Sequence, residues 1–134
     1  MSPATILVVE DDVANRELMV DVLEAHGYRV CQAGDAPAAI ALARTERPNL
    51  ILMDLGLPGL DGVEATRRLK ADPVLRSISI IVVTAHAHTG EPLARAAGCD
   101  AYLTKPIKTP QLLDEVARLI GADPFFFTPP HNTI

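Results

Sequence analysis

Four acidic side chains stand directly at the ends of two apolar runs of the chain. Glu10, Asp11 and Asp12 follow residues 6–9, and Asp54 follows residues 50–53. Carboxylates that meet in one pocket repel one another, and a hard divalent cation such as Mg²⁺ offsets that repulsion by binding their oxygens. Asp12 is also well placed to cap a following helix. These residue types predict a cation site if the two runs end side by side.

Two further polar side chains end apolar runs nearer the C-terminus. Thr84 follows residues 78–83, and Lys105 lies just after residues 101–103. Threonine suits any strand end and lysine is common at surfaces, so neither residue alone indicates a site. Beside the carboxylates, however, they would complete a pocket for a doubly charged anion attached to Asp54. A phosphoryl group is the best candidate for that anion.

The elements that must position these side chains follow from five short apolar runs. They cover residues 6–9, 28–33, 50–53, 78–83 and 101–103, and each precedes a segment with helical periodicity. This alternation predicts parallel strands with helices on both faces of the sheet. We expect an α/β fold, a flavodoxin-like doubly wound (βα)5 unit with five helices and strand order 2-1-3-4-5. In that order the first and third strands end side by side, which brings Glu10 and Asp11 to Asp54.

Cap and breaker residues predict where several helices begin and end. Asp35 is expected to cap the second helix, and Asp72 to end the third. Thr109 is expected to cap the fifth helix, with Pro110 in its first turn. Pro92 lies in the fourth helical segment, and we expect that helix to begin late, with the proline in its first turn.

Length and composition restrict the class of protein. The 134 residues suffice for one domain, and 12 basic against 17 acidic residues give a net charge of -5. Without a basic cluster, direct binding to nucleic acid is not expected. No apolar run is long enough to cross a membrane, so we expect a cytoplasmic protein. The two cysteines lack metal-ligand spacing and fit a reducing compartment.

The set of site residues closely resembles the receiver domain of two-component response regulators, the CheY-like superfamily. The resemblance covers roughly residues 6–120 and rests on Glu10 with Asp11, Asp54, Thr84, Tyr102, and Lys105 with Pro106. It implies that Asp54 is the phosphoacceptor, with Lys105 and Thr84 holding phosphoryl oxygens. It also implies Mg²⁺ as cofactor, bound by Glu10, Asp11, Asp54 and the backbone carbonyl of Gly56. The Lys105–Pro106 peptide bond would be cis.

The resemblance further implies a role in phosphorelay signalling. The donor would be a phosphohistidine on a histidine kinase or histidine phosphotransfer protein. Thr84 would move toward the new oxygens and Tyr102 would fill the vacated space, which makes these two residues the switch. The fourth helix, fifth strand and fifth helix would then bind a downstream protein or a second copy of the chain. Such a protein is a signalling phosphoacceptor, not an enzyme with an external substrate.

The domain boundaries and the rim of the pocket are less typical. Residues 1–121 are expected to form the receiver domain, followed by a tail over 122–134 without an output domain. The tail contains Phe125, Phe126 and Phe127, so it is either a frayed terminus or a segment that packs on the domain, a partner or a second copy. Gly56 and His86 frame the pocket and are expected to tune the lifetime of the phosphorylated state.

Three other classes of protein compete with this interpretation. Dehalogenase-type phosphatases also use an aspartate nucleophile with Mg²⁺, but they need a second aspartate where this chain has Gly56. A flavodoxin would need a phosphate-binding loop after the first strand, where Glu10, Asp11 and Asp12 would repel a phosphate. A receiver fragment of a hybrid histidine kinase or a larger regulator is the remaining alternative.

Overall fold

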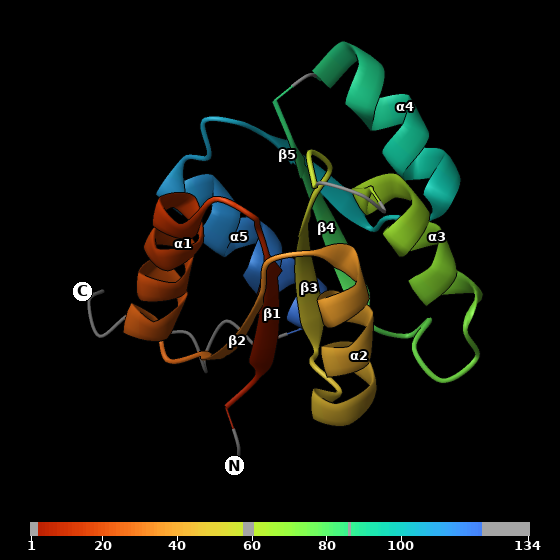
Figure 1. Cartoon of the computed structure of the whole chain (residues 1–134). Coiled ribbons are helices and arrows are strands. Elements are labelled where there is room, and N and C mark those ends of the chain that lie inside the picture. The colour runs from red at the N-terminus through yellow and green to blue at the C-terminus, as the bar shows by residue number, and fades with distance from the viewer. Residues whose placement is uncertain (1–2, 58–60, 86, 122–134) are drawn as a thin grey trace.

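The computed structural model describes residues 3–57, 61–85 and 87–121, with 87–89 described by their backbone alone (Figure 1). His86 and the tail over 122–134 lie outside these ranges. The predictions made for them therefore remain predictions.

A parallel sheet forms the centre of the described chain, as predicted (Figure 1). Its strands pair in the order β2-β1-β3-β4-β5, which confirms the flavodoxin-like topology. The first and third strands are neighbours, with Val9 opposite Met53, so the residues that follow them lie side by side. The strands are β1 (Thr5–Val9), β2 (Arg29–Ala33), β3 (Leu50–Asp54), β4 (Ser79–Thr84) and β5 (Ala101–Thr104).

Helices cover both faces of this sheet (Figure 1). Two of them, α1 (Val13–Ala25) and α5 (Thr109–Ile120), lie on one face. The other face carries α2 (Ala36–Glu46), α3 (Gly62–Ala71) and α4 (Ala87–Ala97). None of the helices in the described ranges combines the length and the apolar character needed to cross a bilayer.

Successive residues of the central strands enter different cores, because side chains alternate across a sheet. Leu7 and Ile51 pack under α2, α3 and α4, whereas Ile6 and Leu50 pack under α1 and α5. Every residue of β3 is buried, including the terminal Asp54. An interior strand covered on both faces therefore carries the predicted phosphoacceptor into the site.

Aspartates cap several helices as the sequence predicts. Asp12 accepts a hydrogen bond from the Asn15 N–H at the start of α1, and Asp35 accepts one from Ala38 at the start of α2. Asp72 follows the last residue of α3. Each N-terminal cap satisfies a backbone donor that the helix itself leaves unpaired.

Two predicted helix starts are wrong. Thr109 does not cap α5, because the Leu112 N–H already bonds the Lys108 carbonyl, so that Lys108 is the cap residue and Thr109 is helical. The fourth helix begins at Ala87 rather than late, which places Pro92 inside α4. Proline is disfavoured in a helix interior. We attribute the helical conformation of residue 92 to the packing of α4 against α3 and the sheet.

Candidate functional site

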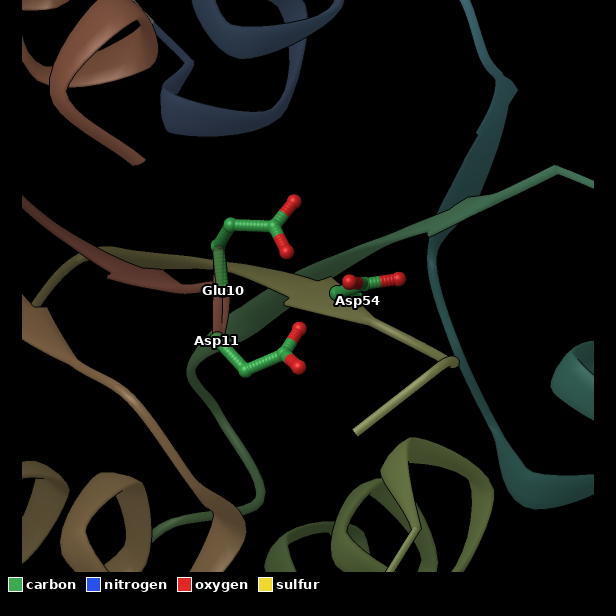
Figure 2. A group of neighbouring side chains, drawn as sticks. All are labelled: Glu10, Asp11 and Asp54. Carbon is green, nitrogen blue, oxygen red and sulfur yellow. The ribbon is translucent and has the colours of Figure 1, made fainter. Parts of the chain in front are cut away.

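Three carboxylates gather where β1 and β3 end. Glu10 and Asp11 follow β1 and Asp54 ends β3, and one oxygen atom from each side chain lies within 4.8 Å of those of the other two. Figure 2 shows the three side chains at these neighbouring strand ends. Glu10 and Asp54 are 1% and 5% exposed, whereas Asp11 is open to solvent. The strand order thus converts two distant acidic segments into one cluster, as predicted.

Lys105 lies beside two of these carboxylates. Its Nζ lies 3.2 Å from Glu10 Oε1 and 3.3 Å from Asp54 Oδ2. Burial lowers the pKa of this ammonium, but the charge of Asp54 and the hydrogen bond to Glu10 outweigh burial and raise the pKa. The side chain therefore stays protonated and offers a fixed positive charge next to Asp54.

The buried position of Glu10 raises the pKa of its carboxyl group. Burial, the hydrogen bond with Asp54 and the charge of Asp54 raise the pKa of Glu10 to about 7. Its position is fixed through the backbone, because Arg16 donates to the Glu10 carbonyl at 2.8 Å. With a pKa of about 7, the Glu10 carboxyl is partly protonated at neutral pH.

The cluster lies in a cleft of about 510 Å³. Thr84, at the end of β4, reaches this cleft with 4% of its surface exposed. Leu55, Val63 and Leu93 contribute apolar walls beside the charged groups. The site therefore combines carboxylates, a hydroxyl and an ammonium in a space large enough for a phosphoryl group.

Gly56 shapes one side of Asp54. Its N–H donates to Asp54 Oδ1 at 3.0 Å, so each oxygen of this carboxylate has a donor. A Cβ added at Gly56 would lie 3.7 Å from the same oxygen, which is an ordinary contact. The backbone here orients the carboxylate, and the missing side chain leaves the rim open.

Gly62 is a site residue that the sequence analysis missed. A Cβ at this first residue of α3 would lie 2.3 Å from the Asp54 carbonyl oxygen and 2.9 Å from the Leu55 Cα. Only glycine lets the helix pack this closely against the backbone that carries Asp54. A glycine directly after the helix cap Asp61 was the available signal, but its spatial neighbour is not visible from local sequence.

The predicted switch residue Tyr102 is half-buried on β5 and packs against the core under α2, α3 and α4. It does not line the cleft, whereas Thr84 does. Pro106 follows Lys105 through a cis peptide bond, as the resemblance implies.

The residues present fit a hard divalent cation. The cluster offers several carboxylate oxygens, and Asp11 faces solvent where an ion can enter. Among the described residues, the three carboxyl groups of the cluster stand beside the Lys105 ammonium, so a bound cation would offset negative charge that this lysine leaves. Among the described residues the cluster consists of carboxylates alone, and such oxygen ligands favour Mg²⁺ over zinc.

Known proteins match this chain in sequence and in fold. The family model for the response regulator receiver domain matches residues 6–117. The chain therefore belongs to the response regulator receiver domain family, which confirms the resemblance. Members of this family act in two-component signalling.

The chain matches curated relatives over nearly their whole length. The chain is 42% identical to the polar-differentiation response regulator DivK of Brucella anthropi over 89% of this chain and 98% of the relative.

Solved structures share the fold of this chain. The receiver domain of sensor histidine kinase PA1611 from Pseudomonas aeruginosa has a TM-score of 0.83 and 38% identity, and the match covers 90% of this chain and 99% of that one. That structure holds a magnesium ion in its active-site cleft. Chemotaxis protein CheY4 of Vibrio cholerae matches with a TM-score of 0.82 and 25% identity over 87% and 98% of the two chains.

Proposed function

We propose that this chain accepts a phosphoryl group on Asp54 from a phosphohistidine of a histidine kinase or phosphotransfer protein. The observation that carries the proposal is the setting of Asp54, a buried carboxylate between the Lys105 ammonium and the Gly56 N–H, at the bottom of an open cleft. An Asp54 oxygen attacks the phosphorus, and the phosphorus–nitrogen bond of the donor breaks. The histidine nitrogen leaves with the electron pair and takes up a proton from solvent.

The chain contributes positioning and charge to this transfer. The Gly56 N–H fixes one oxygen of Asp54 and leaves the other beside Lys105. Lys105 holds one oxygen of the transferred group, and the Thr84 hydroxyl holds another. The Asp54 carboxylate is consumed in the reaction, so the protein acts as a phosphoacceptor and not as an enzyme with an external substrate.

Mg²⁺ would be held by Glu10, Asp11, Asp54 and the backbone carbonyl of Gly56. When bound, it offsets the repulsion between these carboxylates and the incoming phosphoryl group. The neighbouring magnesium-containing structure supports this proposal, as does the acidic cluster of this chain.

The output of the site is a conformational switch. Thr84 moves toward the phosphoryl oxygens, and Tyr102 changes position in response. The changed face, built from α4, β5 and α5, binds a downstream protein or a second copy of the chain. The membership of the family supports a kinase or phosphotransfer partner, and the net charge of -5 disfavours nucleic acid.

We also propose residues 1–121 as the receiver unit and the cytoplasm as the location, with 122–134 as a tail that is either a frayed terminus or a contact segment.

Intact mass after incubation with acetyl phosphate and Mg²⁺ tests the function. We expect one added phosphoryl group on the wild type and none on Asp54→Asn or after chelation. Asp114→Asn is the matched control, because it makes the same change at an exposed position of α5. Addition to Asp54→Asn would contradict the assignment. If the wild type stays unmodified, a phosphorylated histidine phosphotransfer domain replaces acetyl phosphate, and failure with both donors would overturn the proposal.

A further inference from the structure

Helix α4 lies directly against Thr84. The contact is made at Gly90, where an added Cβ would lie 2.6 Å from the Thr84 Oγ1 and 3.1 Å from its Cβ and Cγ2. Gly90 is buried, and so are Ala94 and Ala97 on the same side of the helix. Glycine is a poor helix former, so its presence inside α4 is explained by this close approach.

The same helix also holds Tyr102. The Arg95 guanidinium lies 5.1 Å from the centre of the tyrosine ring, and its Nε donates to Glu91 Oε2 at 2.8 Å. The hydrogen bond with Tyr102 lowers the pKa of Glu91 and raises the pKa of the tyrosine. The phenol thus donates to Glu91 while Arg95 covers the ring, so two α4 side chains fix both the polar end and the face of Tyr102.

We propose that Glu91 and Arg95 are positioning residues for Tyr102, and that α4 carries the movement of Thr84 to this tyrosine through Gly90. The second part rests on the proposed function, because it takes phosphorylation as the event that moves Thr84. Gly90 and Glu91 are adjacent, and Arg95 follows Glu91 by about one helical turn. A displacement of the helix where it touches Thr84 therefore also displaces the two side chains that hold Tyr102.

The strength of the two contacts suits a reversible switch. Arg95 and Glu91 are partly exposed, with side-chain exposures of 55% and 33%. An exposed cation–π contact changes a two-state population by roughly 2- to 5-fold, and an exposed ion pair adds a comparable or smaller factor. Such contacts keep Tyr102 in position in the unphosphorylated protein, and they break when a doubly charged phosphoryl group binds Thr84.

Fluorine NMR of the protein labelled with 3-fluorotyrosine tests the positioning role. The chain has two tyrosines, and Tyr28 is buried in the core under α1 and α5, on the opposite face of the sheet from α4. It serves as an internal reference, and Tyr28→Phe assigns the two resonances. The solvent isotope shift between H₂O and D₂O measures the exposure of each ring without any phosphorylation.

The variants are Glu91→Gln and Arg95→Gln. We expect each to change the chemical shift and the solvent isotope shift of Tyr102 while Tyr28 stays constant. Arg67→Gln is the matched control, because it removes an exposed ion pair from α3 with a similar arginine exposure. An unchanged Tyr102 isotope shift in both α4 variants would overturn the positioning role. An effect of the same size in the control would also overturn it.

Gly90→Ala tests the coupling through α4. Residue 90 makes its close contact with Thr84. Because β4 also pairs with β5 at Val82 and Tyr102, a change at Tyr102 is assigned to the helix if adding Glu91→Gln to Gly90→Ala removes it. We expect the Tyr102 resonance to move toward its position in phosphorylated wild type. A folded Gly90→Ala protein with a wild-type Tyr102 signal would overturn the coupling.

A second measurement covers the case in which Gly90→Ala does not fold. Thr84→Ala approaches the same contact from the strand side, and it should also move the Tyr102 resonance. If wild type takes up no phosphoryl group from any donor, the proposed function fails. The Glu91→Gln and Arg95→Gln results, obtained without phosphate, then still decide the positioning role.

Discussion

At the scale of single residues, Glu10 links the site to pH. Its pKa of about 7 in the folded protein lies above the ordinary value of 4.5, so the folded state binds more protons than the unfolded state between these pH values. The free energy of unfolding contributed by this group therefore falls as pH rises through that window. Ionisation of this buried carboxyl beside Asp54 thus lowers the free energy of unfolding, and it provides a negative charge that can bind a cation.

We predict that metal-free wild type loses roughly 1 to 3 kcal/mol of this contribution between pH 4.5 and 7. Urea unfolding in the presence of a chelator, at several pH values, measures it. Glu10→Gln is the reference, because it cannot ionise at this position. The difference in unfolding free energy between the two proteins should vary with pH, and a constant difference would contradict the pKa assigned to Glu10.

Gly62 and Gly56 provide a second residue-scale prediction. A methyl group at Gly62 would meet the Asp54 backbone at 2.3 Å, whereas one at Gly56 would meet only the Asp54 side chain at 3.7 Å. We expect Gly62→Ala to lose about 1 to 3 kcal/mol of unfolding free energy, or more, and to slow phosphorylation by displacing Asp54. Gly56→Ala should stay close to wild type in thermal unfolding. Equal losses in both variants would show that close backbone packing is not the cause.

At the scale of elements, the local sequence of α4 is unfavourable for a helix. Gly90 and Pro92 both disfavour a helix, yet the structure keeps residues 87–97 helical. Packing through Gly90, Ala94 and Ala97 supplies what local propensity lacks. A helix held by its contacts rather than by its own sequence can shift as a unit when one contact changes.

Pro92→Ala should therefore stabilise α4 locally. The substitution restores a backbone donor and removes a clash with the carbonyl four residues earlier, an effect of up to about 3 kcal/mol in a helix interior. Hydrogen exchange followed by mass spectrometry should show slower exchange of the α4 amides. Amides of α5 provide the internal comparison, and equal exchange of α4 in both proteins would contradict the prediction.

At the scale of the whole molecule, cation binding and folding are linked. The carboxylates of the cluster meet only when β1 and β3 pair, so an ion that binds them favours the folded chain. The net charge of -5 adds a general attraction for cations. Stability should therefore depend on Mg²⁺ beyond its effect on ionic strength.

We predict that Mg²⁺ at ten times its dissociation constant raises the unfolding free energy by about 1.4 kcal/mol. Chemical unfolding with and without the ion, at ionic strength matched with NaCl, measures the change. Asp11→Asn should lose most of it, whereas Asp21→Asn, an exposed change in α1, should retain it. The site assignment fails if Asp11→Asn responds to Mg²⁺ as wild type does.

The sequence by itself determined the order of elements and the place of the site. Alternating apolar runs and helical segments imply a parallel sheet, and right-handed crossovers leave few strand orders for five strands. That order brings Glu10, Asp11 and Asp54 together, as the pairing of β1 with β3 confirms. These features depend on periodicity and connectivity, which are readable along the chain.

Only the tertiary structure decided how closely the elements approach one another. The contacts of Gly62 with the Asp54 backbone and of Gly90 with Thr84 are distances between separate elements, which local patterns do not encode. The helical conformation at Pro92 and the contact of Arg95 with the Tyr102 ring likewise depend on packing between elements. Packing energies summed over several neighbours outweigh the preference of one residue, so such features appear only once the fold has brought those neighbours together.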